Sequence, residues 1–291
     1  MDAINYYFCE HVAALLPSWD VNERKPTAVS PSSPIYHLTQ LKSYNWSRPA
    51  RAHYDKDQIF SLHVAPVNNQ IFYRITDLRE DQNWFYSIKN YPLDAYKRCT
   101  SVTFDCDMPI SNEVTEITSF FENLILPSPP YKFDFPDREH SYYRNHFYQA
   151  VFKEIIAQKL TITDLSLSNL NCDDIEILGP LFEKECLQKC VIKAFDTPSQ
   201  KFSAVISRLL PQRQLQTTII TGINIDASVV DSVVRQWRRY PRKNFEMKLQ
   251  TDGIYNKYDV VSDEKGESHL NVNWMGRFVY LKALKVSPKS P

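Results

Sequence analysis

Hydrophobic and polar residues follow two different rhythms along the second half of the chain. Period-two alternation predicts β-strands near residues 160–167, 188–195, 216–222 and 244–250. Apolar residues at helical spacing predict helices over residues 139–158, 173–186, 199–210 and 227–239. The strand centres lie 27, 27 and 28 residues apart, at Leu165, Ile192, Ile219 and Met247. This nearly constant step of strand plus helix indicates a repeat array.

Such an array predicts an α/β fold in which strand–helix repeats form a parallel, leucine-rich-repeat-like sheet. Right-handed crossovers would place every helix on the same side of that sheet. The strand centres would point inward, flanked by a second inward column of Leu167, Ala194, Thr221 and Leu249. Because side chains alternate along a strand, the opposite, helix-free face should carry Ser166, Lys193, Ile220 and Lys248. An ordinary α/β sheet with units of equal length is the alternative.

The first 136 residues combine helical and strand patterns. Residues 3–16 predict an amphipathic helix whose apolar face carries Phe8, Val12, Leu15 and Leu16. A polar, proline-rich linker over 20–34 and a short helix over 36–46 follow. Alternation over 60–64 and 71–75 predicts a hairpin with a turn at Asn68-Asn69. The remaining expectations are strands at 84–88 and 100–105, a helix over 111–124 and a proline-rich break over 127–136.

After Gly253 the repeat pattern ends. Residues 258–261 and 270–274 predict a hairpin that 278–281 continues, and these antiparallel strands would cap the last open edge of the array. The sequence therefore predicts four segments: an N-terminal helical segment over 1–50, a hairpin and strand–helix unit over 51–136, the repeat array over 137–252, and a cap with a tail over 253–291.

Composition narrows the possible functions. The 13% of aromatic residues supports a sizeable core, and 34 basic residues balance 34 acidic ones, so no bulk charge favours nucleic acid or an anionic membrane. Only five glycines occur, with none before Gly179, which excludes the common glycine-rich nucleotide-binding loops. No signal peptide or membrane span is expected, and six sparse cysteines are typical of reduced thiols. These features predict an intracellular, cytoplasmic protein, with a nuclear location still open.

No catalytic, cofactor-binding or metal-binding set assembles in the sequence, so a non-enzymatic protein is expected. His140 and His146 are six residues apart, a spacing that separates two helical ligands by about 120°. Cys186 and Cys190 lack a second metal-ligand pair, and Cys106 lies between two aspartates that would raise its pKa. Asp173-Asp174 falls at a predicted helix start, where the helix dipole accounts for both carboxylates.

Residues 235–243, RQWRRYPRK, form the main basic cluster of the chain. Cations at a helix C-terminus offset the helix dipole, and this structural interpretation is favoured. The interleaved Trp237 and Tyr240 supply the ring stacking that single-stranded nucleic acids use. Nucleic-acid binding through this segment is therefore the alternative function.

Short motifs connect the chain to a known family. The opening MDAINYYFCEHVAALLP, followed by a short helix ending at Trp46 and a β-hairpin, resembles nematode F-box proteins with a degenerate F-box. The phrase VVRQW leading into FEMKL is similar to the F-box-associated region of those proteins, and LSLSNL at 165–170 loosely matches leucine-rich repeats. This resemblance implies a substrate-recognition subunit of a cullin-type ubiquitin ligase, whose N-terminal helices dock the adaptor subunit.

Together these observations predict a protein-interaction module without cofactors that binds an unidentified protein ligand. The expected contact residues are those of the N-terminal helix face and of the helix-free column of the array. They are Phe8, Val12, Leu15, Leu16, Ser166, Lys193, Ile220 and Lys248.

Overall fold

The computed structural model divides the chain into two compact units, Met1–Phe133 and Asp134–Pro291. It describes residues 8–9, 12–13, 34–56, 58–67, 70–77, 84–87, 97–104, 118, 121, 131–136, 144–170, 172–194, 200–251 and 260–284. Both units combine helices with strands, which confirms the predicted α/β class. No helix in the described part of the chain is long and apolar enough to cross a lipid bilayer.

Within the described ranges of the first unit, the elements with defined bounds are two helices followed by four strands. The helices are α2 (Pro34–Thr39) and α3 (Tyr44–Lys56), and the strands are β1 (Gln58–Val67), β2 (Gln70–Asp77), β3 (Trp84–Ser87) and β4 (Lys97–Phe104). β1 and β2 form the predicted antiparallel hairpin, and β4 runs parallel to β1. The single helix expected over 36–46 is wrong. α2 stops at Thr39, and a new helix begins where the Ser43 carbonyl accepts the N–H of Ser47 at 2.9 Å.

The predicted proline-rich break over 127–136 is also wrong, because it contains strand β5 (Tyr131–Phe135). Its prolines lie at the ends of the segment, while Phe133 and Phe135 alternate with polar residues and are buried. Of the helix expected over 111–124, Thr118 and Phe121 are described and both are helical. The rest of that helix lies outside the described residues.

The second unit alternates strands and helices before ending in antiparallel strands. Its first elements are α5 (Arg144–Ala157), β6 (Ile162–Leu170), α6 (Cys172–Glu176), α7 (Gly179–Glu183), β7 (Lys189–Ala194), α8 (Gln200–Leu209), β8 (Thr217–Ile225), α9 (Ala227–Arg239) and β9 (Glu246–Thr251). The last are β10 (Val260–Ser262), β11 (His269–Met275) and β12 (Phe278–Ala283). β6 to β9 pair in parallel in chain order, and β12 pairs antiparallel with β9.

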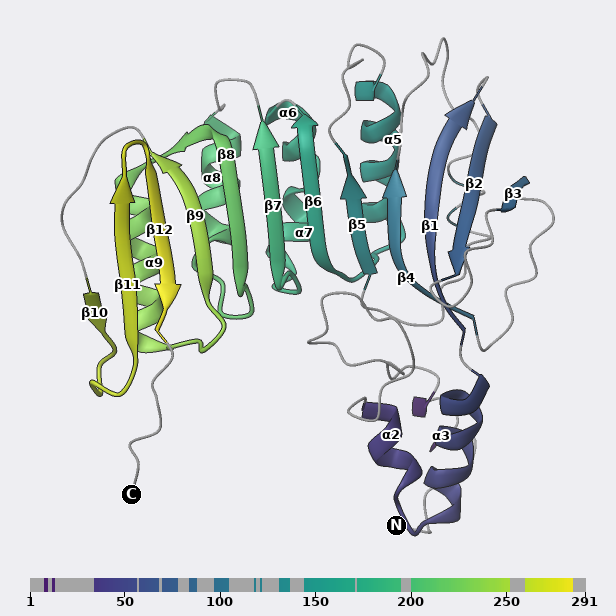
Figure 1. Ribbon diagram of the computed structural model, residues 1–291. Helices are drawn as coiled ribbons and strands as arrows, with labels where there is room; N and C mark the ends of the chain where they lie inside the picture. The colour runs from purple at the N-terminus through teal and green to yellow at the C-terminus, as the bar shows by residue number, and fades with distance from the viewer. Residues whose placement is uncertain are drawn as a thin grey trace. The chain divides into compact units, whose positions relative to one another are not determined.

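Helices α6 to α9 lie on one face of strands β6 to β9 (Figure 1). Burial alternates along β7, β8, β9 and β12, so the helix-facing side chains are buried and those on the other face stay partly accessible. One buried row crosses the sheet through Leu167, Ile192, Ile220, Leu249 and Val279. Helix α9 covers the sheet with Val230, Val233, Val234 and Trp237, which share one helical face.

The pairing register corrects the predicted columns. Ile220 is fully buried in the helix-facing row, whereas Ile219 lies on the helix-free face between Val191 and Lys248. Thr221, expected to point inward, is on that same outer face and is half-buried. Along the buried row, the spacings from Leu167 to Leu249 are 25, 28 and 29 residues, rather than 27, 27 and 28. Because Ile219 and Ile220 are adjacent, β8 shows the same hydrophobic pattern whichever of the two points into the core. A shift of one residue in the pairing of β8 exchanges its buried and accessible faces.

A bulge in β8 contributes to the unequal spacing. Between the pairs Ile220–Leu249 and Ile225–Thr251, four residues of β8 face one residue of β9, Gln250. The Gln250 side chain accepts the Gly222 N–H at 2.9 Å and donates to the Asn224 side chain at 3.0 Å. Gly222 has φ +81°, and a Cβ there would lie 1.5 Å from the Ala194 carbonyl oxygen. Only glycine fits this close approach to β7.

The register predicts opposite outcomes for two neighbouring substitutions. Ile220→Glu buries an unpaired carboxylate and should destabilise the fold by more than about 4 kcal/mol. Ile219→Glu places its carboxylate on the accessible face and should change the free energy of unfolding by about 1 kcal/mol or less. Chemical denaturation followed by circular dichroism measures both. Equal losses for the two variants would contradict the assigned faces.

Gly222→Ala should destabilise the chain by more than about 3 kcal/mol, because the new methyl group collides with β7 in a backbone region that alanine adopts poorly. Gly276→Ala is the matched control. Gly276 also has positive φ (+63°), but a Cβ there meets nothing within 4 Å, so a loss of about 1 kcal/mol is expected. Similar melting temperatures for the two variants would show that β8 does not approach β7 as described.

Candidate functional site

The helix-free face of the second unit carries a row of partly accessible side chains that crosses six paired strands. The row runs from Ser166 through Val191, Ile219, Lys248 and Tyr280 to Asn273. Phe278 lies beside Tyr280 on the same face, since both alternate with buried residues of β12. We call the apolar members, Val191, Ile219, Phe278 and Tyr280, the apolar patch. Exposed Met275 of β11 pairs with Phe278 and extends this apolar area. Among the described elements of the second unit, no helix lies on this face of the sheet (Figure 1).

Lysines surround and enter the apolar patch. The Lys248 ammonium lies 4.8 Å from the ring centre of Phe278 and 5.4 Å from that of Tyr280, within range of a cation–π interaction. Lys189, Lys193 and Lys282 occupy neighbouring positions on this face, against the carboxylates of Asp164 and Glu246. Lys282 and Glu246 form an exposed ion pair at 3.6 Å. The face therefore combines apolar contact area with a net positive charge.

The structure brings together part of the predicted contact set. Ser166, Lys193 and Lys248 are on the helix-free face, as expected, and Ser166 and Lys248 share a row. Ile220 does not belong to the set, because it is buried beneath the helices. Sequence reasoning missed the aromatic members, Phe278 and Tyr280. The alternation FVYLKA marks them as one face of a strand, but only the antiparallel pairing with β9 places that face beside Lys248.

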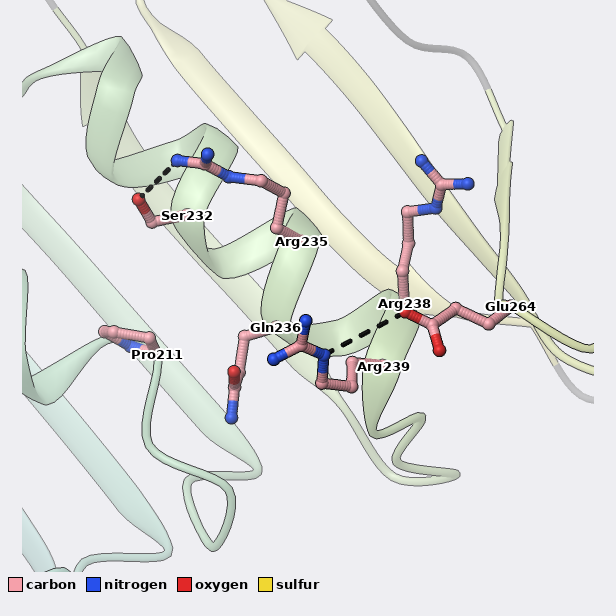
Figure 2. Close-up of a pocket in the computed structure, with 7 residues that line it drawn as sticks. All are labelled: Pro211, Ser232, Arg235, Gln236, Arg238, Arg239 and Glu264. Carbon is pink, nitrogen blue, oxygen red and sulfur yellow. Dashed lines mark hydrogen bonds and ion pairs between the residues drawn. The ribbon is translucent and has the colours of Figure 1, made fainter.

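A second candidate surface is a pocket along helix α9, drawn in Figure 2. The pocket has a volume of about 560 Å³. One wall is the solvent-facing side of α9, with Ser232, Arg235, Gln236, Arg238 and Arg239. Pro211, from the loop after α8, and Glu264, from the turn before β11, complete the lining.

Polar contacts orient the pocket side chains. The Arg235 guanidinium donates to the Ser232 hydroxyl at 3.2 Å, and Arg239 Nε lies 4.0 Å from the Glu264 carboxylate (Figure 2). The Glu264 backbone N–H donates to the Arg238 carbonyl at 3.1 Å, which joins the turn to the end of α9. The side chains of Arg239 and Glu264 are each about two-thirds exposed, so solvent screens the attraction between them. The pocket thus has three guanidinium groups against one carboxylate.

Trp237 and Arg242 of the basic segment have structural roles. Trp237 is fully buried, and the Tyr240 ring has the Arg213 guanidinium 3.3 Å from its centre. Arg242 turns inward and donates to the Gln212 carbonyl at 2.6 Å and to the Leu215 carbonyl. Burial lowers the pKa of the Arg242 guanidinium to about 10, so it remains a cation at neutral pH. Trp237 therefore offers no stacking surface, and Arg213 occupies one face of the Tyr240 ring, which is 38% exposed.

The predicted N-terminal contact face is partly described. Residues 8–9 and 12–13 are helical, with Phe8 54% exposed, Val12 half-buried, and Cys9 and Ala13 buried. Phe8 contacts Trp46 of α3 edge to face, with ring centres 6.3 Å apart. Leu15 and Leu16 lie outside the described residues.

The candidate metal-ligating and nucleophilic residues do not assemble into a site among the described residues. No group of three or more His, Cys, Asp or Glu side chains there could hold a metal ion. Burial raises the pKa of the Cys190 thiol to about 12, which disfavours the reactive thiolate. Cys186 is half-buried and hydrogen-bonds to the Lys184 carbonyl at 3.2 Å. Asp174 is buried and accepts a hydrogen bond from Gln149, while His140 and Cys106 lie outside the described residues.

No protein-family model, curated protein or solved structure matches this chain. The F-box resemblance therefore stays a prediction, and function has to be inferred from the two surfaces themselves.

Proposed function

We propose that the chain is a non-enzymatic protein-interaction module that binds a protein ligand on the helix-free face of its second unit. The observation that carries this proposal is the apolar patch, in which half-accessible side chains from β8 and β12 flank Lys248 and Val191 of β7 extends the apolar area. A row of contact residues on a rigid sheet suits recognition of another protein. Sheet strands hold such side chains in place without the ordering cost that a loop would add.

The charge on this face indicates the chemistry of the ligand. Four lysines lie on the face, against two carboxylates of which one is already paired with Lys282. A complementary surface would present apolar side chains toward Ile219 and carboxylates toward Lys193 and Lys248. Tyr280 and Phe278 are the expected anchors, since aromatic side chains carry much of the binding energy at interfaces.

The proposed architecture is leucine-rich-repeat-like in its parallel part. Its support is the chain-ordered parallel pairing of β6 to β9 with helices on one face. The antiparallel strands β12, β11 and β10 then serve as the cap that covers the edge of β9. In this arrangement the face without helices is the recognition surface.

Site-specific photocrosslinking tests the recognition face. A benzoylphenylalanine at position 219 should capture a protein in cells that express the chain, and Lys248→Glu should reduce that product several-fold by reversing the local charge. The same photoreactive residue at Ala204, which is exposed on α8, is the control. Mass spectrometry identifies the captured protein. Equal capture from positions 219 and 204, or no effect of Lys248→Glu, would contradict the proposed face.

We propose in addition that the module serves as a substrate-recognition subunit of a cullin-type ubiquitin ligase. The support is the F-box resemblance of the opening residues, together with an exposed Phe8 beside α3. The purified adaptor subunit should co-elute with the full chain in gel filtration. Phe8→Glu should weaken that complex about tenfold or more by placing a charge in an apolar contact. Val260→Glu, a similarly exposed position of the second unit, should leave the complex intact. Absence of a wild-type complex would remove the ligase assignment while leaving the recognition face untouched.

A further inference from the structure

The pocket along α9 differs from the apolar patch in the type of its cationic side chains. Its lining contains three arginines and no lysine, whereas the cations of the helix-free face are all lysines. Helix-dipole compensation accounts for basic residues near the end of α9, but lysine would satisfy it equally. Guanidinium groups differ from ammonium groups in their planar fork of donors, which matches the oxygens of a phosphate. The use of arginine at all three positions therefore points to a ligand.

Helical geometry places the three arginines on one exposed side of α9, from which their guanidinium groups point in different directions (Figure 2). Arg235, Arg238 and Arg239 are related by spacings of three and four residues, so they share one face of α9 (Figure 2). All three side chains are exposed, and within the described residues the closest carboxylate to any of them is that of Glu264, 4.0 Å from Arg239. Most of their N–H donors consequently remain available to an incoming anion.

Helix α9, which carries these arginines, is anchored at both ends. Asp226 caps α9 by accepting the Ser228 N–H at 2.6 Å, and the hydrogen bonds from Ser228 hold the pKa of Asp226 below its ordinary value. At the other end, Trp237 is buried against the sheet. These anchors restrict the helix before any ligand arrives, which lowers the entropic cost of binding.

The two flanking loops are held as well. Arg242 donates to the Gln212 carbonyl, directly after Pro211, and thereby fixes that loop. The turn that carries Glu264 is organised by Asp263, whose side chain accepts the Glu267 N–H at 2.8 Å and whose backbone N–H donates to the Ser268 carbonyl. Three chain segments thus meet around the pocket in a defined geometry.

We propose that this pocket binds a phosphate monoester, a compact dianion toward which the exposed side chains of Arg235, Arg238 and Arg239 turn from one side of α9. The volume of about 560 Å³ accommodates one phosphate and the group that carries it. An extended single-stranded nucleic acid fits less well, because Trp237 is buried and Arg213 occupies one face of the Tyr240 ring, which leaves the segment a single ring face for base stacking. Glu264 sets the affinity, since its carboxylate competes with the ligand for Arg239.

Titration of the full chain with phenyl phosphate at low salt, followed by ³¹P NMR line broadening, tests the site. Arg235→Gln/Arg238→Gln should weaken binding about tenfold or more, because each lost charge-assisted contact contributes separately. Lys201→Gln/Arg208→Gln, two exposed cations of α8, changes the net charge equally and should leave binding within about twofold. Glu264→Gln should tighten binding several-fold by releasing Arg239. Equal weakening by the two double variants would overturn the proposal, as would weaker binding by Glu264→Gln.

Two further probes distinguish the source of the phosphate. A neutral peptide with one phosphoserine should displace phenyl phosphate better than inorganic phosphate does if the ligand is a phosphorylated protein. Inorganic phosphate should displace phenyl phosphate as well as the phosphoserine peptide does if the ligand is a small phosphorylated molecule. Both results support the site. A third result would overturn the compact phosphate site: phenyl phosphate shows no binding, while single-stranded oligonucleotides bind with an affinity that grows with their length. That result would favour a nucleic-acid-binding surface.

Discussion

The alternation of side chains across strands β7, β8, β9 and β12 is the constraint on which the rest of the second unit depends. Each strand directs one set of residues into the core beneath the helices and the other set to the opposite face. The row from Leu167 to Val279 fixes this alternation, because a slip by one residue in β7, β9 or β12 would bury a lysine. The burial of one face thereby determines what the other face can recognise.

Helix α9 connects the core to the pocket. Val230, Val233, Val234 and Trp237 face the sheet, and the same helical turns direct Arg235, Arg238 and Arg239 to solvent. Arg242 belongs to neither set, since its hydrogen bonds to the carbonyls after α8 make it part of the scaffold. The fold therefore divides the basic segment 235–243 into a structural residue, Arg242, and three solvent-accessible arginines that line the pocket.

Local periodicity was sufficient to predict most elements of the second unit. The bounds of α9 match the predicted helix over 227–239, because Asp226 supplies the cap and apolar residues recur at helical spacing. The face of β8 was not predictable in the same way, because Ile219 and Ile220 are adjacent and flanked by threonines on both sides. A signal was nevertheless present in Gly222, since a glycine within a strand pattern indicates a bulge or a close backbone approach. The burial of Trp237 was also readable from its helical spacing with Val230, Val233 and Val234.

The two candidate surfaces were harder to predict because they are assembled from distant segments. The apolar patch needs β12 to insert beside β9, ahead of β11, which no local pattern specifies. The pocket needs Pro211, Glu264 and α9 to meet, and these lie in three separate parts of the chain. In β5, the prolines at the segment ends obscured the alternation of Phe133 and Phe135. Sequence periodicity therefore predicted elements, whereas the surfaces followed from their pairing.

The accessibility of one face of the sheet is tested most directly by methyl NMR of isoleucine-labelled protein with a soluble paramagnetic probe. The Ile219 methyl signals should broaden strongly, while those of Ile192 and Ile220 stay sharp, because only Ile219 lies on the face without helices. Equal protection of Ile219 and Ile220 would mean that both faces are covered. Preferential broadening of Ile220 would reverse the register of β8. Either result would contradict a recognition surface centred on Ile219.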